Sequence, residues 1–184
     1  DKPANFTSVY SKAVATEPHP TLARAKVPIL EHLDGTPPLT ESLVITEYLE
    51  DRWPRMAEQT AQQRAAVRLF VERFNSAISY MALLRAEEGS AAEAEAQQAL
   101  VAGMKSTDAF LREYADAEGP FFLRDFAMAE EACAPFALRF WHVLPAMRPQ
   151  HSPSALLEEH KLDRLKVVVV DVVVVAVVVV VAAR

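Results

Sequence analysis

Cysteine and glycine are scarce in this sequence, which has one cysteine and four glycines among 184 residues. One cysteine cannot form an internal disulfide, and a chain of this length buries enough surface to fold without one. A reducing compartment is therefore expected, the cytoplasm first and an organelle as the alternative. A glycine-rich phosphate loop needs several glycines close together, and the chain has only four in total. Neither G-x-G-x-x-G nor G-x-x-x-x-G-K-S/T occurs. The sequence therefore does not favour the nucleotide-binding folds that use these loops.

An excess of positive charge is also missing. The chain carries 19 basic and 25 acidic side chains, which gives a net charge of −6. Residues 1–54 hold five basic against eight acidic side chains, and residues 55–184 hold 14 against 17. Nucleic-acid binding needs concentrated positive charge, so no nucleic-acid partner is expected. None of the five histidines stands at a metal-ligand spacing from another histidine or from Cys133, so no metal site is expected.

The two ends of the chain do not resemble natural ends. The chain opens at Asp1 without a methionine, a basic region or an apolar leader segment, so we expect no signal or transit peptide and infer that the gene starts upstream. Residues 167–183 consist of thirteen valines, three alanines and Asp171. That length is the lower limit for a membrane span, but valine is a poor helix former and the buried Asp171 would be costly. We interpret these residues as unidentified ones written as valine, expect no membrane span, and draw no chemistry from them.

The first part of the chain mixes strand and helix signals. The apolar run at 26–33 is followed by the turn residues 34–38, which predicts a hairpin. From Ser42, a residue type that favours helix N-caps, apolar side chains follow at helical spacing and predict a helix over 42–52 that stops before Pro54. Everything after this point is helical or linking, so we place a domain boundary between residues 54 and 55.

The second part of the chain reads as a helical bundle. Apolar side chains at spacings of three and four predict helices over 60–85, capped by Thr60, and over 91–114. A third helix is expected over 127–144, with Pro135 inside it, and a short one over about 154–165. No internal repeat is present.

The order of these features resembles the soluble glutathione transferases, most closely their omega- and lambda-like branch. The likeness rests on Lys26-Val27-Pro28-Ile29-Leu30-Glu31, on Thr40-Glu41-Ser42, on Glu47-Tyr48-Leu49-Glu50, on Gly119-Pro120-Phe121-Phe122-Leu123 and on Ala134-Pro135-Phe136. It covers nearly the whole chain. The resemblance implies an α+β thioredoxin-like N-terminal domain, of which residues 1–54 are the C-terminal part, and an all-α C-terminal domain over residues 55–184. In that domain the valine-rich tail corresponds to an ordinary last helix.

The residues of the first two motifs suit the binding of a small extended peptide such as glutathione. A proline after a strand residue can adopt the cis isomer, which turns the N–H and C=O of Val27 outward to pair with a peptide. Glu41-Ser42 stands where a loop enters a helix, so the Ser42 hydroxyl and free N–H groups suit the γ-glutamyl carboxylate, and Glu41 can face the α-amino group. The simpler alternatives are an ordinary turn proline at Pro28 and a plain N-cap at Ser42. The two motifs together favour a glutathione site made of Val27, Pro28, Glu41 and Ser42.

Two further expectations come from the resemblance alone. The segment Asp1-Lys2-Pro3 is similar to one in omega-like members whose lysine approaches the glycine carboxylate of glutathione, so Lys2 is added to the predicted site. The family's thiol-activating tyrosine, serine or cysteine lies before the segment that opens this chain. The catalytic residue is therefore unknown, and we interpret the missing strand, helix and strand as incompletely recorded sequence.

The resemblance implies a glutathione-dependent transferase or thiol transferase, with glutathione as cosubstrate and a small electrophile or mixed disulfide as the second substrate. The alternative is a non-catalytic subunit that serves as an interaction module in a larger complex, and a homodimer is compatible with either. One departure affects the helix predicted at 127: Ala127 and Glu130 stand where the family has a capping serine or threonine and an aspartate. Cys133, between two alanines on that helix, is expected to pack rather than to react.

Overall fold

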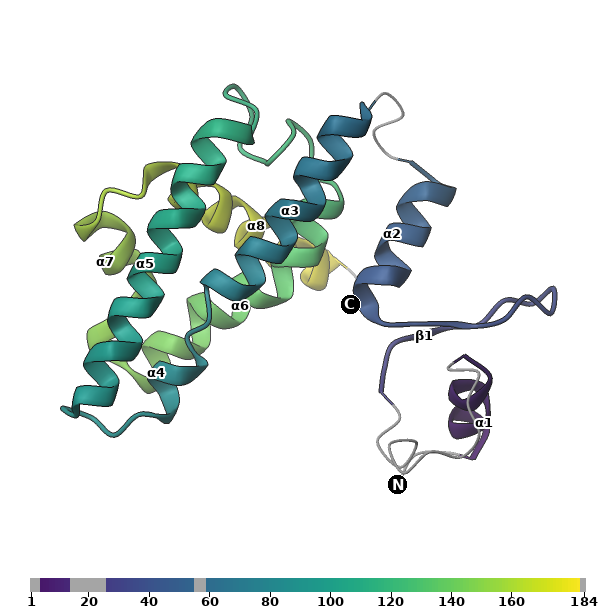
Figure 1. The fold of residues 1–184 in the computed structure, drawn as a ribbon, viewed down its shortest axis with the longest axis horizontal. Coiled ribbons are helices and arrows are strands. Elements are labelled where there is room, and N and C mark those ends of the chain that lie inside the picture. Colours follow the sequence, from purple (N-terminus) through teal and green to yellow (C-terminus); the bar gives the residue numbers. More distant parts are fainter. Residues whose placement is uncertain (1–3, 14–25, 55–58, 183–184) are drawn as a thin grey trace. The chain divides into compact units, whose positions relative to one another are not determined.

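The computed structural model describes residues 4–13, 26–54 and 59–182, and the chain divides into two compact units, residues 1–57 and 58–184 (Figure 1). The division lies close to the boundary placed between residues 54 and 55. Each unit is described by itself.

The smaller unit contains a short hairpin between two helices. Its elements are α1 (Ala4–Ala13), β1 (Ile29–Leu30), β2 (Leu39–Thr40) and α2 (Ser42–Arg52). The strands pair antiparallel, with Ile29 opposite Thr40 and Leu30 opposite Leu39, and Gly35 takes a positive φ of 86° in the turn that joins them. The hairpin and α2 confirm the sequence predictions. The sequence analysis missed α1, because its Thr7-Ser8-Val9 segment combines three residues of modest helix propensity.

The larger unit is a helical bundle (Figure 1). Its elements are α3 (Ala61–Ala77), α4 (Met81–Arg85), α5 (Ala91–Tyr114), α6 (Met128–Met147), the 3₁₀ turn η2 (Pro149–His151), α7 (Pro153–Glu159) and α8 (Asp163–Ala182). Helix α3 packs against α5 and α6, and α8 packs against the same two helices. Phe70 and Phe122 are fully buried and stack with their ring centroids 4.8 Å apart, which places the aromatic core between α3 and the segment before α6.

The predicted helix over 60–85 is two helices. Thr60 does cap α3, since its hydroxyl accepts from the Gln63 N–H at 3.1 Å, but the helix ends at Ala77 and α4 starts at Met81. Ile78 and Tyr80 are both buried. Two residues apart on one helix point in nearly opposite directions, so the break allows both side chains to reach the core.

The predicted helix over 154–165 is also wrong. Helix α7 ends at Glu159, Lys161 takes a left-handed conformation with φ 54°, and α8 starts at Asp163. The Leu162 N–H donates to the Leu157 carbonyl at 2.9 Å, which closes the turn and buries Leu162. The expectation of a helical tail is confirmed, because α8 continues to Ala182. Of the helices in the described ranges, none is long and apolar enough to cross a membrane.

Helix α6 starts without a capping side chain, as the sequence indicates. Ala127 stands at the N-cap position with an extended backbone and no side-chain acceptor. The Glu130 carboxylate instead accepts from the Ala127 N–H at 3.1 Å and from the Phe122 N–H at 2.7 Å. Half of a capping box is therefore present, and it also holds the segment that leads into the helix.

Candidate functional site

The first predicted site residues lie just before β1. The Val27–Pro28 peptide bond is cis, and the Val27 side chain is 74% exposed. Within the described residues, the Val27 N–H and C=O make no backbone hydrogen bond. As far as the described residues are concerned, both groups are available to pair with an extended ligand, in the way that one strand adds to another.

The second pair of predicted site residues lies between β2 and α2. Glu41 has φ 68° and ψ 116°, a left-handed conformation that is unfavourable by about 1–2 kcal/mol for a residue with a side chain. Its carbonyl accepts the first intrahelical bond of α2, from the Ile45 N–H at 3.0 Å. Glu41 is thus the N-cap, and the expectation that Ser42 could serve as a plain N-cap is wrong: Ser42 is the first helical residue.

The start of α2 has the properties of an anion site. The Glu41 side chain makes no capping hydrogen bond, and the N–H groups of Ser42, Leu43 and Val44, in the first turn, have no partner inside α2. The side chains of Glu41 and Ser42 are exposed. Free N–H groups and the positive end of the helix dipole attract a carboxylate, while the Glu41 carboxylate beside them suits an ammonium group.

The hairpin brings these two pairs of residues together. Because Ile29 pairs with Thr40, the residues before β1 and after β2 lie at the same end of the hairpin. Val27 and Pro28 directly precede β1, and Glu41 and Ser42 directly follow β2. Four of the five predicted glutathione-binding residues therefore share one end of one supersecondary unit. Lys2, the fifth, lies outside the described residues.

Cys133 does not belong to a reactive site. The thiol is buried on α6, and this burial raises the pKa of Cys133 well above its ordinary value. A thiol held in its protonated form is a poor nucleophile, which agrees with the expected packing role. In the part of the chain that the structure describes, no group of three or more histidine, cysteine, aspartate or glutamate side chains is placed to hold a metal ion.

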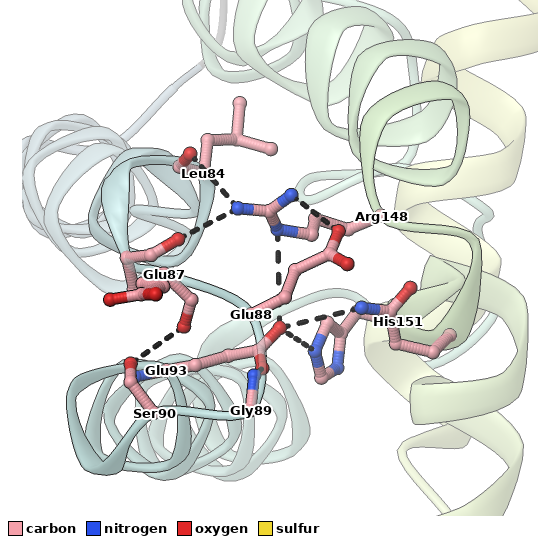
Figure 2. A network of polar contacts seen from close by, with 10 residues as sticks. Leu84, Glu87, Glu88, Gly89, Ser90, Glu93, Arg148 and His151 are labelled. Carbon is pink, nitrogen blue, oxygen red and sulfur yellow. Dashed lines mark hydrogen bonds and ion pairs between the residues drawn. The ribbon is translucent and has the colours of Figure 1, made fainter.

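A buried polar network in the helical unit was not predicted (Figure 2). Arg148, at the end of α6, donates to the Ala86 carbonyl at 2.7 Å and pairs with Glu88 at 2.7 Å. His151 Nε2 lies 3.0 Å from Glu93 Oε1, and the other carboxylate oxygen of Glu93 accepts from the Gly89 N–H at 2.7 Å. The Gly89 bond, helped by His151, lowers the pKa of Glu93. The network ties the α4–α5 turn to the end of α6, and a separation of about sixty residues hides it from sequence patterns.

Among the known proteins that match this chain, two are in keeping with this geometry. Glutathione S-transferase U10 of Arabidopsis thaliana is 36% identical over 78 residues, which are 40% of this chain and 33% of that protein. The crystal structure of glutathione transferase Omega 3C from Trametes versicolor superposes with a TM-score of 0.55 over 87% of this chain and 77% of that one, at 22% identity. The chain is similar to glutathione transferases and has their fold. No family model matches.

The comparisons confirm the resemblance and the fold class deduced from the sequence. The small two-stranded sheet is consistent with an incomplete thioredoxin-like domain, and together with the helical C-terminal domain it agrees with the glutathione transferase fold. The omega- and lambda-like branch has looser support, since the sequence match is to U10 and the omega likeness is structural. The chain spans about a third of the length of the curated relative that it matches.

Proposed function

We propose that this chain is part of a glutathione-dependent transferase and binds glutathione at the end of the hairpin. The observation that carries the proposal is the start of α2, where Glu41 in a left-handed conformation precedes three N–H groups without a partner in the helix. Unfavourable backbone conformations of this kind cluster at ligand sites, where they are part of the function. The similarity to glutathione transferases supports glutathione as the ligand.

In this proposal each residue meets a different part of glutathione. The N–H and hydroxyl of Ser42 donate to the γ-glutamyl carboxylate, and the Glu41 carboxylate accepts from the α-amino group. The backbone N–H and C=O of Val27 pair with the cysteinyl residue of glutathione, while Pro28 fixes the direction of the chain before β1. Lys2 is assigned to the glycine carboxylate. Together these contacts hold an extended tripeptide along one end of the hairpin.

Calorimetric titration of the full-length protein with glutathione tests this site. The double variant Glu41→Ala, Ser42→Ala removes both side chains and should weaken binding at least tenfold, because each lost charge-assisted hydrogen bond contributes about 1.5–3 kcal/mol. The matched control, Ser106→Ala with Glu113→Ala, changes the same residue types at exposed positions of α5 and should bind like the parent. Equal affinities for the parent and the double variant would remove these two residues from the site.

The reaction proposed is attack by the thiolate of bound glutathione. On a small electrophile such as a chloronitrobenzene it forms a carbon–sulfur bond and expels chloride, and on a mixed disulfide it forms a new disulfide and releases the other sulfur as a thiolate. Turnover with a chloronitrobenzene electrophile and with hydroxyethyl disulfide distinguishes the two. Rates above the uncatalysed background with either substrate would support the proposed transferase activity. Background rates with both, together with stoichiometric purification in a larger complex, would instead support a non-catalytic interaction module.

A further inference from the structure

A hollow on the helical unit lies outside the proposed glutathione site. Its volume is about 420 Å³, within the range of small-molecule sites. The lining residues are Ala94, Gln97, Gln98, Val101, Ala102 and Lys105 from α5, and Glu159 with His160 from the end of α7. All of them belong to residues 58–184, so the hollow is defined within one unit.

The sequence of α5 explains why the surface is hollowed there. The α5 residues that line the hollow recur every three or four positions and form one face of the helix. The adjacent face of α5, with Leu100, Met104 and Leu111, is buried in the bundle. Ala94 and Ala102 are small and leave an apolar floor, which the longer polar side chains surround.

The charges around this floor are not satisfied by the protein. Among the described residues, neither the Lys105 ammonium nor the Glu159 carboxylate makes a hydrogen bond or an ion pair, and the two are not paired with each other. Glu158, the residue beside Glu159, pairs with Lys166. The amides of Gln97 and Gln98 are likewise without a recorded partner in these ranges and offer donors together with acceptors.

We propose that this hollow binds a small zwitterion with an apolar body, of the class of an apolar dipeptide. The ligand carboxylate pairs with Lys105, its ammonium group pairs with Glu159, and its peptide group faces the glutamine amides. Its side chains lie on the floor of Ala94, Val101 and Ala102. A ligand with a single charge would pair with only one of Lys105 and Glu159 and would leave the other without a partner.

The length of the hollow agrees with this ligand class. Ala94 and Lys105 are eleven residues apart on α5, which corresponds to about 16 Å along the helix axis. Two extended residues span about 7 Å of backbone and leave room for their side chains. A single small anion would use a fraction of this space.

Calorimetric titration with phenylalanylleucine tests the proposal on the full-length protein. The titration is run both without glutathione and with saturating glutathione, and heat that persists in both conditions comes from outside the glutathione site. Two analogues each lack one charge: the N-acetyl form has no ammonium group, and the C-terminal amide has no carboxylate. Variants Lys105→Gln and Glu159→Gln remove the matching charges of the protein at exposed positions.

The expected result is a crossed pattern of affinities. Lys105→Gln should lower the affinity for the dipeptide about tenfold and leave the affinity for the amide analogue unchanged. Glu159→Gln should also lower the affinity for the dipeptide about tenfold, but should leave the affinity for the N-acetyl analogue unchanged. Ala102→Phe fills the floor and should abolish binding, whereas Ala92→Phe, at an exposed alanine of α5 outside the hollow, should not.

Absence of saturable binding to the parent protein would overturn the proposal. So would equal losses for both analogues in both charge variants, or an undiminished affinity in Ala102→Phe. These outcomes leave the proposed function untouched, because glutathione binding is measured separately at residues of the other unit.

Discussion

At the scale of single residues, Glu130 has the most consequential position in the helical unit. Its side chain is almost fully buried, and its carboxylate satisfies the N–H groups of Phe122 and Ala127. Burial raises the pKa of Glu130, and the two backbone hydrogen bonds oppose that rise. The sequence showed that a capping side chain was absent at Ala127, but the second bond of Glu130, to a residue eight positions earlier, could only be found in three dimensions.

Replacing Glu130 should be costly. Glu130→Ala leaves two buried N–H groups without an acceptor and opens a small cavity, so the free energy of unfolding should fall by about 3 kcal/mol. Urea unfolding followed by circular dichroism measures the change. The exposed Glu113→Ala serves as control and should change stability by less than about 0.5 kcal/mol. A loss for Glu130→Ala no larger than that of the control would contradict this role.

Restoring a capping hydroxyl at residue 127 should stabilise α6. Ala127 already has the extended backbone of an N-cap, so the hydroxyl in Ala127→Ser can accept from the Glu130 N–H, and a gain of about 1 kcal/mol is expected. The exposed Ala109→Ser on α5 should instead lose a few tenths of a kcal/mol. Differential scanning calorimetry compares the two variants, and a lower Tm for Ala127→Ser would show that residue 127 does not cap the helix.

The lowered pKa of Glu93 predicts how stability depends on pH. A carboxyl whose pKa is lower in the folded state stabilises the fold at a pH above its unfolded pKa, and this contribution is lost as the pH falls through the folded pKa. The difference in stability between the parent and Glu93→Gln should therefore shrink from about pH 5 to pH 3. Urea titrations across this range measure it, with Glu113→Gln as control. A difference that stays constant with pH would mean that the Glu93 charge contributes nothing.

At the scale of elements, the sequence predicted those helices whose bounds are determined by residues within the helix and directly beside it. Helices α2 and α5 have regular apolar spacing and clear ends, and both match the structure. The break between α3 and α4 was missed, because it depends on what the chain packs against. Gly103 on α5 lies directly against the last residue of α3: an added Cβ would stand 2.2 Å from the Ala77 carbonyl oxygen. No pattern within 60–85 reveals this close approach.

The approach of α5 to the end of α3 can be tested at Gly103. Alanine is a better helix former than glycine by about 1 kcal/mol, so Gly103→Ala would stabilise an unhindered helix. In this protein, however, the added methyl group would collide with the Ala77 carbonyl, which must move. Gly103→Ala should therefore destabilise the fold and lower the free energy of unfolding by about 2 kcal/mol. Chemical denaturation measures the sign. A more stable Gly103→Ala variant would disprove the close approach.

At the scale of the whole molecule, the sequence predicted the architecture through two motifs and a change of pattern. The Val27-Pro28 and Glu41-Ser42 motifs indicated the site, and the structure brings both to one end of the hairpin. The left-handed backbone of Glu41 could not be foreseen, because glutamate rarely adopts it and nothing in its neighbourhood of the sequence requires it. The long valine tail could be predicted as a helix, and no site is assigned to its side chains.

The central claim is that glutathione binds at the start of α2. Hydrogen–deuterium exchange of the full-length protein, with and without glutathione, measures this most directly, because the N–H groups of Ser42, Leu43 and Val44 have no partner in the helix and exchange quickly when free. Glutathione should slow exchange in peptides that cover residues 41–45, and the Glu41→Ala, Ser42→Ala variant should lose that protection. Bound glutathione that leaves exchange at 41–45 unchanged would contradict the account.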